Sequence, residues 1–387
     1  MKLLSIDNYI DFECIGGNCP ISCCGGNWRI DIDAAAMDRY KSVEGEFGER
    51  LRNGIIKNGD SHAFRLDENT GDCVFLNENK LCSIYRELGP DALCFTCRSY
   101  PRSMYQVGDI MFCFLANSCP EVNRIIVQKS EQMKTLFDDS DGDTGDSCRN
   151  EDVPDYKRFN DAIKAFNTGM HIIQDQKMTF KERLYLLLFF IERFQDLVRS
   201  GKDVAGLIEL FSQPEVYRMF LESRTENEAG CADKIHIFMM VYRTLLADSY
   251  DHPMWVRCKQ LADDIVHMDS MDIGVLRKAF LDLEKKGIGK EFERLMIYRF
   301  FAVFMMGFED QDYLDKLAYE IILNTALAAY TALTEAVQGH ECTQEDRILF
   351  YSLCARIDHT KNQKEKLVGE LKRDGCYEID KLIRLVG

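Results

Sequence analysis

The spacing of apolar residues changes along this 387-residue chain. Beyond residue 155 they recur at intervals of three and four, which is the spacing of amphipathic or buried α-helices. Glycines stand between or at the ends of these stretches, and the only prolines in this region are Pro214 and Pro253. The pattern predicts a mostly α-helical C-terminal domain over residues 156–387. Its clearest helices are expected at 156–173, 180–198, 233–246, 292–306 and 313–337.

The first 137 residues have a different pattern, with short segments and many turn-forming residues. Residues 28–33 alternate apolar and polar side chains and residues 110–115 form a brief apolar run, so both are expected to be strands. Residues 34–52 are expected to be helical. Such short segments bury little apolar surface by themselves. The sequence therefore predicts a mixed fold class, with a small, irregular α+β domain built around metal over residues 1–137.

An acidic stretch separates the two regions. Residues 138–155 hold eight acidic residues and one basic residue, and they are rich in turn formers. A segment this polar cannot form a packed element, so it is expected to be a linker or surface loop. Its acids do not continue to the glutamate that an EF-hand loop needs at its twelfth position, which favours a solvated connector over a calcium site.

Charge and hydropathy limit the classes of partner. The net charge of −16 argues against nucleic acid, because phosphate binding needs clustered lysine and arginine, and it suits a cationic partner better. The apolar run at residues 184–191 is far too short to span a bilayer, so no membrane partner is expected. Residues 1–10 contain no apolar segment long enough for export, so the protein is expected in the cytoplasm.

Nine cysteines in the first 119 residues are grouped as metal ligands often are. In a reducing compartment thiols stay free unless a metal binds them, which favours metal binding over disulfides. Soft thiolates from several loops suit an iron–sulfur cluster or a zinc ion better than a hard cation. The predicted metal ligands are Cys14, Cys19, Cys23, Cys24, Cys73, Cys82, Cys94, Cys97 and Cys119.

The spacing is compatible with more than one arrangement of these ligands. Nine thiols suffice for two four-ligand centres, or for one centre with packed cysteines beside it. Cys23 and Cys24 are adjacent, so both can bind one centre only where the loop turns sharply. Cys113 lies in the expected strand and is interpreted as a small apolar core residue. The cysteines without ligand spacing are expected to be ordinary thiols: Cys148, Cys231, Cys258, Cys342, Cys354 and Cys376.

Two familiar cofactor motifs do not fit the chain. Radical enzymes that cleave S-adenosylmethionine use cysteines spaced C-x3-C-x2-C, and here Gly26 occupies the third position after Cys19 and Cys23. A Rossmann site needs a glycine-rich turn between a strand and a helix, whereas Gly287 and Gly289 lie in a charged helical stretch. Any cofactor is therefore expected to bind by another architecture.

Short motifs in the first third of the chain follow one another in a distinctive order. They are Cys14-x4-Cys19-x3-Cys23-Cys24-x3-Trp28, Cys73-Val-Phe-Leu, Cys82-Ser-Ile-Tyr85, Leu88-Gly89, Cys97-Arg-Ser-Tyr-Pro-Arg102 and Ser118-Cys-Pro-Glu121-x2-Arg124. Together they resemble the flagellin lysine-N-methylase family, and the helical tail extends the likeness more loosely over the whole length. The cysteine-rich part also resembles a broader group of zinc- or iron-chelating domains, with counterparts for Cys19, Cys23, Cys24, Cys73, Cys82 and Cys97.

The resemblance implies an enzyme that transfers methyl groups from S-adenosylmethionine to lysine ε-amines of flagellin in the bacterial cytoplasm. Such a site must desolvate the lysine or supply a base, because the amine is protonated at neutral pH. An aromatic or acidic lining would suit the sulfonium cation, and Tyr85 and Tyr100 are candidates for it. The sequence singles out no catalytic base and no cofactor pocket.

A second hypothesis is a non-catalytic module that stores, delivers or senses iron or zinc. The long helical domain favours the enzyme, because a protein substrate needs a second surface and a cleft between domains. Structural roles are favoured over substrate contact for Tyr100-Pro101-Arg102 and for Glu121 with Arg124, which are expected to pair on a helix that begins after Pro120.

Overall fold

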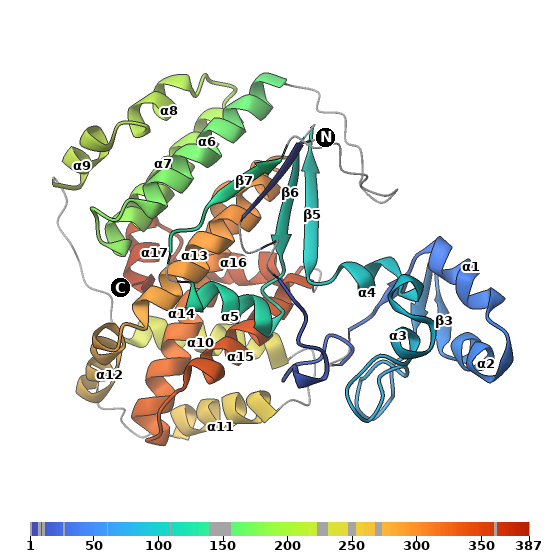
Figure 1. Cartoon of the computed structure of the whole chain (residues 1–387). Helices are drawn as coiled ribbons and strands as arrows, with labels where there is room; N and C mark the ends of the chain where they lie inside the picture. Colours follow the sequence, from blue (N-terminus) through green and yellow to red (C-terminus); the bar gives the residue numbers. More distant parts are fainter. Residues whose placement is uncertain are drawn as a thin grey trace.

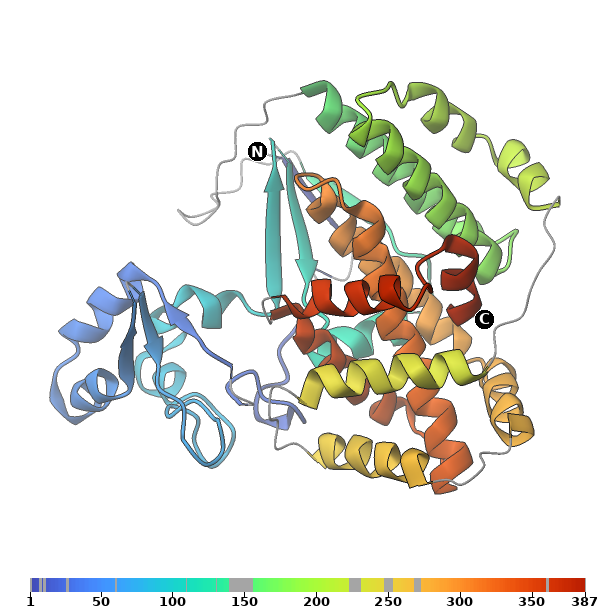
Figure 2. The same ribbon diagram turned by 180° about the vertical axis from the view of Figure 1, so that it is seen from behind.

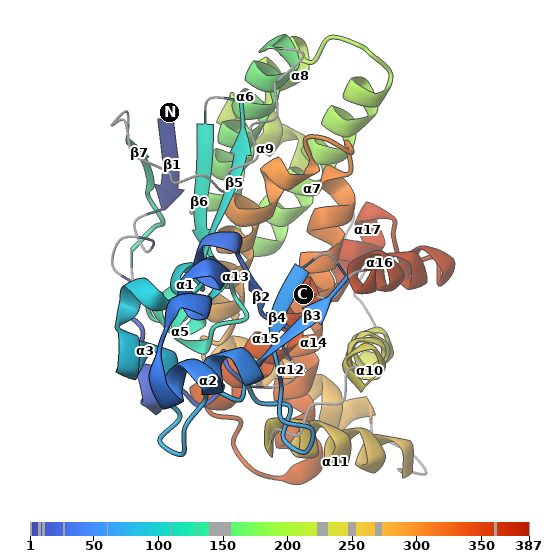
Figure 3. The same cartoon turned by 90° about the vertical axis from the view of Figure 1, so that its right-hand side faces the viewer.

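The chain folds into two packed parts (Figure 1). A small lobe, residues 28–99, projects from the side of a larger helical body, and the view from behind shows the same separation (Figure 2). Figure 3 looks onto the small lobe with the helices of the body behind it. The computed structural model describes residues 2–6, 9, 12–25, 28–59, 61–108, 110–129, 131–138, 156–222, 231–246, 253–267, 273–359 and 362–386.

The small lobe combines a three-stranded antiparallel sheet with four short helices. The strands, in the order β2-β4-β3, are β2 (Asp31–Ile32), β3 (Ile55–Asn58) and β4 (Ser61–Phe64). The helices are α1 (Ala34–Ser42), α2 (Gly45–Asn53), α3 (Ser83–Leu88) and α4 (Phe95–Ser99). The lobe has its own small core, which contains Tyr40, Leu51, Phe64, Phe75, Ile84, Cys73 and Cys94. Two of the predicted metal ligands are thus core residues of this lobe.

Asp33 connects two helices of the small lobe. One carboxylate oxygen accepts a hydrogen bond from the N–H of Ala36 and so caps α1, where the first turn leaves backbone donors open. The other oxygen accepts from the N–H of Phe95 at 2.6 Å, at the start of α4. The helix that carries Cys97 is therefore held against the end of β2.

The strand and the helix expected in this lobe both form, but each structural element is shorter than the sequence predicts. The strand expected at 28–33 is reduced to the two residues of β2. The helix expected at 34–52 is divided into α1 and α2, because the backbone is extended at Val43 and then turns at Gly45. The φ angle of Gly45 is 75°, a left-handed conformation that glycine adopts without a steric penalty.

A four-stranded sheet belongs to the helical body. Its order is β5-β6-β1-β7, with β1 parallel to β6 and the other pairs antiparallel. Every residue of β6 is buried, and β6 is paired on both sides, which explains why its sequence is a continuous apolar run. The strand expected at 110–115 is confirmed, and Cys113 is buried within it. The strands are β1 (Lys2–Ile6), β5 (Arg102–Val107), β6 (Ile110–Leu115) and β7 (Thr135–Asp138).

Helices make up the rest of the body. The long helix α14 is central, and α7, α10, α12, α13, α15 and α17 all pack against it. None of the helices that the structure describes has the length and apolar character to cross a membrane. The helices are α5 (Pro120–Gln128), α6 (Tyr156–Gln174), α7 (Phe180–Arg199), α8 (Ala205–Phe211), α9 (Pro214–Glu222), α10 (Cys231–Leu246), α11 (Pro253–His267), α12 (Ile273–Lys285), α13 (Gly289–Val303), α14 (Tyr313–Gln338), α15 (Gln344–Ala355), α16 (Gln363–Arg373) and α17 (Ile379–Val386).

The helices expected from the apolar spacing are confirmed as α6, α7, α10, α13 and α14. Helix α7 begins at a capping box in which Thr179 and Glu182 bond each other's backbone N–H. The stretch expected at 292–306 is helical throughout, but after α13 it tightens into the 3-10 turn η4 (Phe304–Gly307). Two further 3-10 turns are η2 (Gly16–Asn18), which lies between Cys14 and Cys19, and η5 (Arg356–His359), which follows α15.

The boundary between the two hydrophobic cores falls at a different place in the sequence from the domain boundary that composition predicts. Buried residues of β1, β6 and α5 belong to the same core as the long helices; Phe112 of β6, for example, packs edge-on against Phe166 of α6 at 6.1 Å. The domains 1–137, 138–155 and 156–387 stay a prediction. Of the acidic segment 138–155, only Asp138, the last residue of β7, lies within the described residues.

Candidate functional site at the cysteine cluster and the junction of the two parts

Five predicted ligands gather at the core of the small lobe. Cys73 and Cys94 are buried in its core, and Cys24, Cys82 and Cys97 pack against that core. The N–H of Cys73 donates to the carbonyl oxygen of Cys24 at 2.7 Å, which attaches the loop that carries Cys24 to the lobe. The charges of Cys73 and Cys82 act on Cys24, and those of Cys24 and Cys82 act on Cys97. We refer to these five residues as the lobe cysteines.

Hydrogen bonds between thiols join neighbouring cysteines in pairs. A bond between Cys94 and Cys97 is the largest cause of the lowered pKa of Cys94 and of the raised pKa of Cys97. A second bond, between Cys23 and Cys24, lowers the pKa of Cys23 to about 7 and raises the pKa of Cys24. In each pair the sulfur with the lower pKa accepts the hydrogen bond, and the other sulfur keeps its proton.

Of the four other predicted ligands, Cys119 directly precedes α5 of the helical body, and Cys23 neighbours both Cys119 and the lobe cysteines Cys73 and Cys82. Burial raises the pKa of Cys119 to about 12, and the charges of Cys19 and Cys23 add to the increase, so these three thiols are neighbours. The thiol of Cys19 donates to the carbonyl of Ile21 at 3.1 Å. Cys14 is exposed, and its sulfur accepts from the N–H of Gly16 at 3.4 Å. We call Cys14, Cys19, Cys23 and Cys119 the body cysteines.

Three predicted ligands each stand directly before a helix. Cys82 precedes α3, Cys94 precedes α4 and Cys119 precedes α5. Backbone N–H groups of the turn that follows act to lower the pKa of each thiol, against the effect of burial. Helix N-termini favour the thiolate, which is the form of cysteine that binds metals.

The chemistry of these donors fits a thiophilic metal centre. All nine predicted ligands are free thiols, and the lobe cysteines approach one another from four chain segments. Within the described part of the chain, however, no three histidine, cysteine, aspartate or glutamate side chains form a group that could hold a metal ion. The thiols gather without forming a closed coordination shell, so the ligand set and the number of centres stay predictions.

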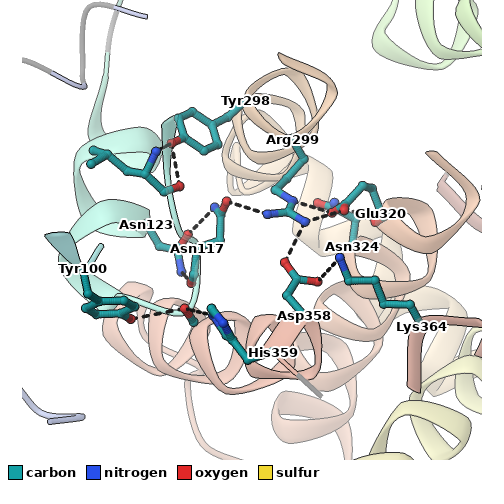
Figure 4. Close-up of polar contacts among 12 residues, drawn as sticks. Tyr100, Asn117, Asn123, Tyr298, Arg299, Glu320, Asn324, Asp358, His359 and Lys364 are labelled. Carbon is teal, nitrogen blue, oxygen red and sulfur yellow. Dashed lines mark hydrogen bonds and ion pairs between the residues drawn. The ribbon is translucent and has the colours of Figure 1, made fainter. Parts of the chain in front are cut away.

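An aromatic and polar cluster joins the small lobe to the helical body beside these cysteines. The ring of Trp28 lies edge-on to Tyr100 at 5.3 Å and tilted against His359 at 4.9 Å. The hydroxyl oxygen of Ser118 is 3.2 Å from that of Tyr100 and 2.9 Å from Nε2 of His359 (Figure 4). Buried Arg356 lies over the Trp28 ring at 4.6 Å. We call Trp28, Tyr100, Ser118, Arg356 and His359 the junction cluster.

The junction cluster is close to the body cysteines in sequence and in space. Ser118 directly precedes Cys119, and the charge of Cys119 contributes to the raised pKa of Tyr100, after the larger effect of burial. Arg356 acts to lower the pKa of both Cys19 and Cys23. The cysteines and the junction cluster therefore share one electrostatic environment.

A buried charged network lies beside the junction cluster (Figure 4). Arg299 donates to Glu320 at 2.6 Å and to Asp358 at 2.8 Å, and it also donates to the side-chain oxygen of Asn117 at 3.2 Å. Lys364 is 3.2 Å from the second oxygen of Asp358. Burial acts to raise the pKa of Asp358, but Arg299 and Lys364 outweigh it and hold the pKa at about 2. The network thus fixes η5, the turn that carries His359.

A pocket of about 280 Å³ adjoins the same network, between η4, α14 and α16. Glu320 and Lys364 line it, so the buried network forms part of its wall. The remaining lining is mixed: acids such as Asp315 and Glu365 alternate with lysines, and Tyr319 supplies an aromatic surface. A pocket with both signs of charge and an aromatic wall is suited to a zwitterionic or cationic ligand.

Residues 167–385 match the family described as the FliB lysine N-methylase C-terminal domain, which is more than half of the chain. The chain belongs to the FliB lysine N-methylase family. It is 32% identical over 127 residues to the flagellar biosynthetic protein FliU of Salmonella muenchen, a stretch that covers 32% of this chain and 75% of that protein.

Two further relatives of this FliB family member are named lysine-N-methylase, from Salmonella typhimurium and Salmonella choleraesuis. Each is 29% identical over 127 residues, which is 32% of this chain and 31% of the relative. The chain therefore aligns with about a third of the length of these two relatives. No solved structure matches the chain.

Within this FliB family chain, sequence patterns indicated only part of the junction cluster. Tyr100 was a candidate for an aromatic lining and lies in the cluster, whereas Tyr85 is 54% exposed on α3. His359 and Arg356 gave no signal, because an isolated histidine or arginine in a helical region has no distinctive spacing. Arg124 pairs with Glu121 on α5, which confirms the predicted pairing, and with Glu345 on α15 at 2.7 Å.

Proposed function

We propose that this protein is a lysine N-methyltransferase that transfers methyl groups from S-adenosylmethionine to lysine ε-amines of flagellin in the cytoplasm before export. The proposal rests above all on membership of the FliB lysine N-methylase family. The printed names of the relatives, lysine-N-methylase and flagellar biosynthetic protein, support a lysine acceptor and a flagellar substrate.

The proposal includes an iron–sulfur cluster, or alternatively zinc, bound by the N-terminal cysteines. The lobe cysteines are the best candidates to hold it, because they are close neighbours and all are thiols. A bound centre would supply positive charge that keeps these sulfurs deprotonated and would tie together loops that bury little apolar surface. The body cysteines are available for a second centre or for support of the first.

The substrate side chain sets its own chemical requirements. A free lysine amine has a pKa of about 10.4, so it arrives protonated and must lose a proton before it can attack a methyl group. A protein with a net charge of −16 attracts cationic side chains, which favours encounter with lysine-bearing surfaces. Trp28 and Tyr100 offer aromatic surface for the lysine methylenes at the junction of the two parts.

The methyl donor also has a suitable location in the protein. S-adenosylmethionine carries a sulfonium, an ammonium and a carboxylate, so its pocket needs both signs of charge. The pocket between η4, α14 and α16 provides acids and lysines beside the ring of Tyr319. Lys364 lines this pocket and contacts Asp358, the residue before His359, so the pocket and the junction cluster are adjoining.

Formation of S-adenosylhomocysteine tests the proposal. Anaerobically purified protein is incubated with S-adenosylmethionine and with flagellin from cells that lack their own methylase. We expect the product only when flagellin is present, and none when its lysines have first been acetylated. If no product forms and calorimetry detects no binding of S-adenosylmethionine, the methyltransferase is excluded and the alternative, a module that stores, delivers or senses iron or zinc, is favoured.

A further inference from the structure

His359 is the member of the junction cluster with the chemistry of a base. It ends the 3-10 turn η5, the residue is only partly shielded from solvent, and its Nε2 atom is 2.9 Å from the hydroxyl oxygen of Ser118. The two residues are far apart in the sequence, so only the folded protein brings them together. We propose that His359 accepts the proton that the substrate lysine must release, an inference that rests on the methyltransferase function proposed above.

The hydrogen bond between Nε2 of His359 and Ser118 accommodates the tautomer in which Nδ1 is free to accept a proton. When Nε2 carries the hydrogen and donates it to Ser118, the lone pair is on Nδ1. Within the described part of the chain, Nδ1 has no hydrogen-bond partner. Ser118 also bonds the hydroxyl of Tyr100, whose pKa is raised well above 10 by burial, so the phenol keeps its proton. In this arrangement Nε2–H donates to Ser118 and the Ser118 hydroxyl donates to the oxygen of Tyr100, which leaves Nδ1 available.

Burial is the main factor that favours the neutral form of His359. Burial lowers the pKa of His359, and Lys364, Arg356 and Arg299 lower it further. Asp358 acts in the opposite direction, but its carboxylate is already engaged by Arg299 and Lys364. A neutral imidazole with a pKa somewhat below the working pH can take up a proton and then return it to water.

Aromatic rings border the imidazole of His359 at the connection between the two parts of the protein. Trp28 contacts one side of His359, and Tyr100 stands edge-on to Trp28, so the imidazole borders an aromatic surface. Aromatic faces attract ammonium groups and pack against methylene chains. The same residues connect the two parts of the protein, and a site at such a connection is a common position for enzyme chemistry.

The proposed reaction balances in two steps. The lysine ε-ammonium gives one proton to Nδ1 of His359, which becomes imidazolium and leaves a neutral amine. The amine lone pair then forms a bond to the methyl carbon of S-adenosylmethionine, while the bond from that carbon to sulfur breaks and its electron pair stays on sulfur. The products are methyl-lysine in its ammonium form and neutral S-adenosylhomocysteine, and His359 returns its proton to solvent.

Substitution of His359 by glutamine isolates the proton transfer. The glutamine amide can still donate a hydrogen bond to Ser118 but cannot accept a proton at neutral pH. We expect His359→Gln to lower kcat by about 10²- to 10⁴-fold with little change in KM, which is the usual effect of losing a general base. His171→Gln, at an exposed position on α6, is the matched control and should leave kcat unchanged.

Two further readouts distinguish a base from a structural contact. The wild-type rate should rise with pH and level off above the pKa of His359, below its ordinary value, and this inflection should disappear in His359→Gln. Added imidazole should restore part of the rate of His359→Ala. A His359→Gln protein that binds S-adenosylmethionine normally and keeps the wild-type rate and inflection would overturn the proposal.

The outcome for the wild-type protein separates this inference from the proposed function. If the wild-type enzyme transfers no methyl group, the methyltransferase proposal fails, and NMR titration of the histidine ring still decides the state of His359. A pKa below the ordinary histidine value that changes in Ser118→Ala would support a neutral imidazole that Ser118 positions to accept a proton. A pKa above the ordinary value would overturn it, because the ring would already be protonated at neutral pH.

Discussion

The guanidinium carbon of Arg356 lies 4.6 Å from the centre of the Trp28 ring, and Arg356 also donates to the carbonyl of Ser22 at 3.3 Å. One arginine from the C-terminal part of the chain thus holds both ends of the loop that carries Cys23 and Cys24. Because Arg356 is only 3% exposed, this contact is shielded from water and is stronger than a surface cation–π contact. The helical body therefore helps to define the geometry of the cysteine loop.

Arg356→Met should weaken this connection while keeping much of the side-chain volume. We expect a loss of about 1–3 kcal/mol in the free energy of unfolding, from the cation–π contact and the hydrogen bond together, measured by urea denaturation. Arg86→Met, which removes an exposed arginine paired with Glu87 on α3, is the control and should change stability by less than about 1 kcal/mol. Equal effects of the two substitutions would show that Arg356 is not a structural link.

Cys97→Ser tests the lobe cysteines as metal ligands. A serine oxygen is a poor ligand for a thiophilic metal, so we expect protein that is depleted of metal or aggregated. Cys376→Ser, in the helical body, should retain the wild-type metal content. Elemental analysis for iron, zinc and acid-labile sulfide also separates a cluster from a zinc ion. Unchanged metal content in a well-folded Cys97→Ser protein would contradict the assignment.

Arg299→Met tests the buried charged network. It leaves Glu320, which is fully buried, without its cation, and we expect a loss of about 3–5 kcal/mol at neutral pH. Burial raises the pKa of Glu320. The folded protein therefore binds a proton at Glu320 more readily than the unfolded chain does, and the stability deficit of the variant should shrink as pH falls toward the ordinary glutamate pKa. Lys372→Met, which removes a half-exposed partner of Asp315, is the control.

A deficit in Arg299→Met that does not change with pH would show that the loss comes from packing rather than from the unpaired carboxylate. The measurement is thermal or urea unfolding of both variants and the wild-type protein between neutral pH and the ordinary glutamate pKa.

Ser118→Ala tests the positioning role of the hydroxyl between Tyr100 and His359. The imidazole stays in place but loses the hydrogen-bond partner of Nε2, so we expect kcat to fall by roughly tenfold, about 1.4 kcal/mol, a smaller loss than in His359→Gln. Ser42→Ala on α1, where the hydroxyl donates to the carbonyl of Arg39 away from the junction cluster, is the control. A kcat equal to that of the control would remove Ser118 from the catalytic arrangement.

Local sequence patterns predicted the helices well and the short elements poorly. The long helices α6, α7, α10 and α14 follow from apolar spacing, because each buries one continuous face. The split between α1 and α2 depends on a single backbone turn at Gly45, which composition does not reveal. Strand β1 joins a sheet through pairing with β6, more than a hundred residues away, so no local pattern predicts it.

The grouped cysteines of the candidate site could be predicted because several residues of one type recur at short spacing. Single residues such as His359 could not. Grouped cysteines indicated a thiol-rich site, and the structure brings the five lobe cysteines together. Their division from the body cysteines depends on the packing of residues 12–25 between two cores. His359 reaches Ser118 only because α15 and η5 return to the start of α5, and the sequence contains no signal for that contact.

Transfer of a deuterated methyl group is the most direct test of the central claim. The metal-loaded protein is incubated with flagellin and with S-adenosylmethionine labelled on its methyl group, and the flagellin is then digested and mapped by mass spectrometry. The account predicts label on the ε-nitrogen of lysine residues and on no other side chain, with none when the protein is omitted. Flagellin that stays unlabelled, although the protein is folded and metal-loaded, would contradict it.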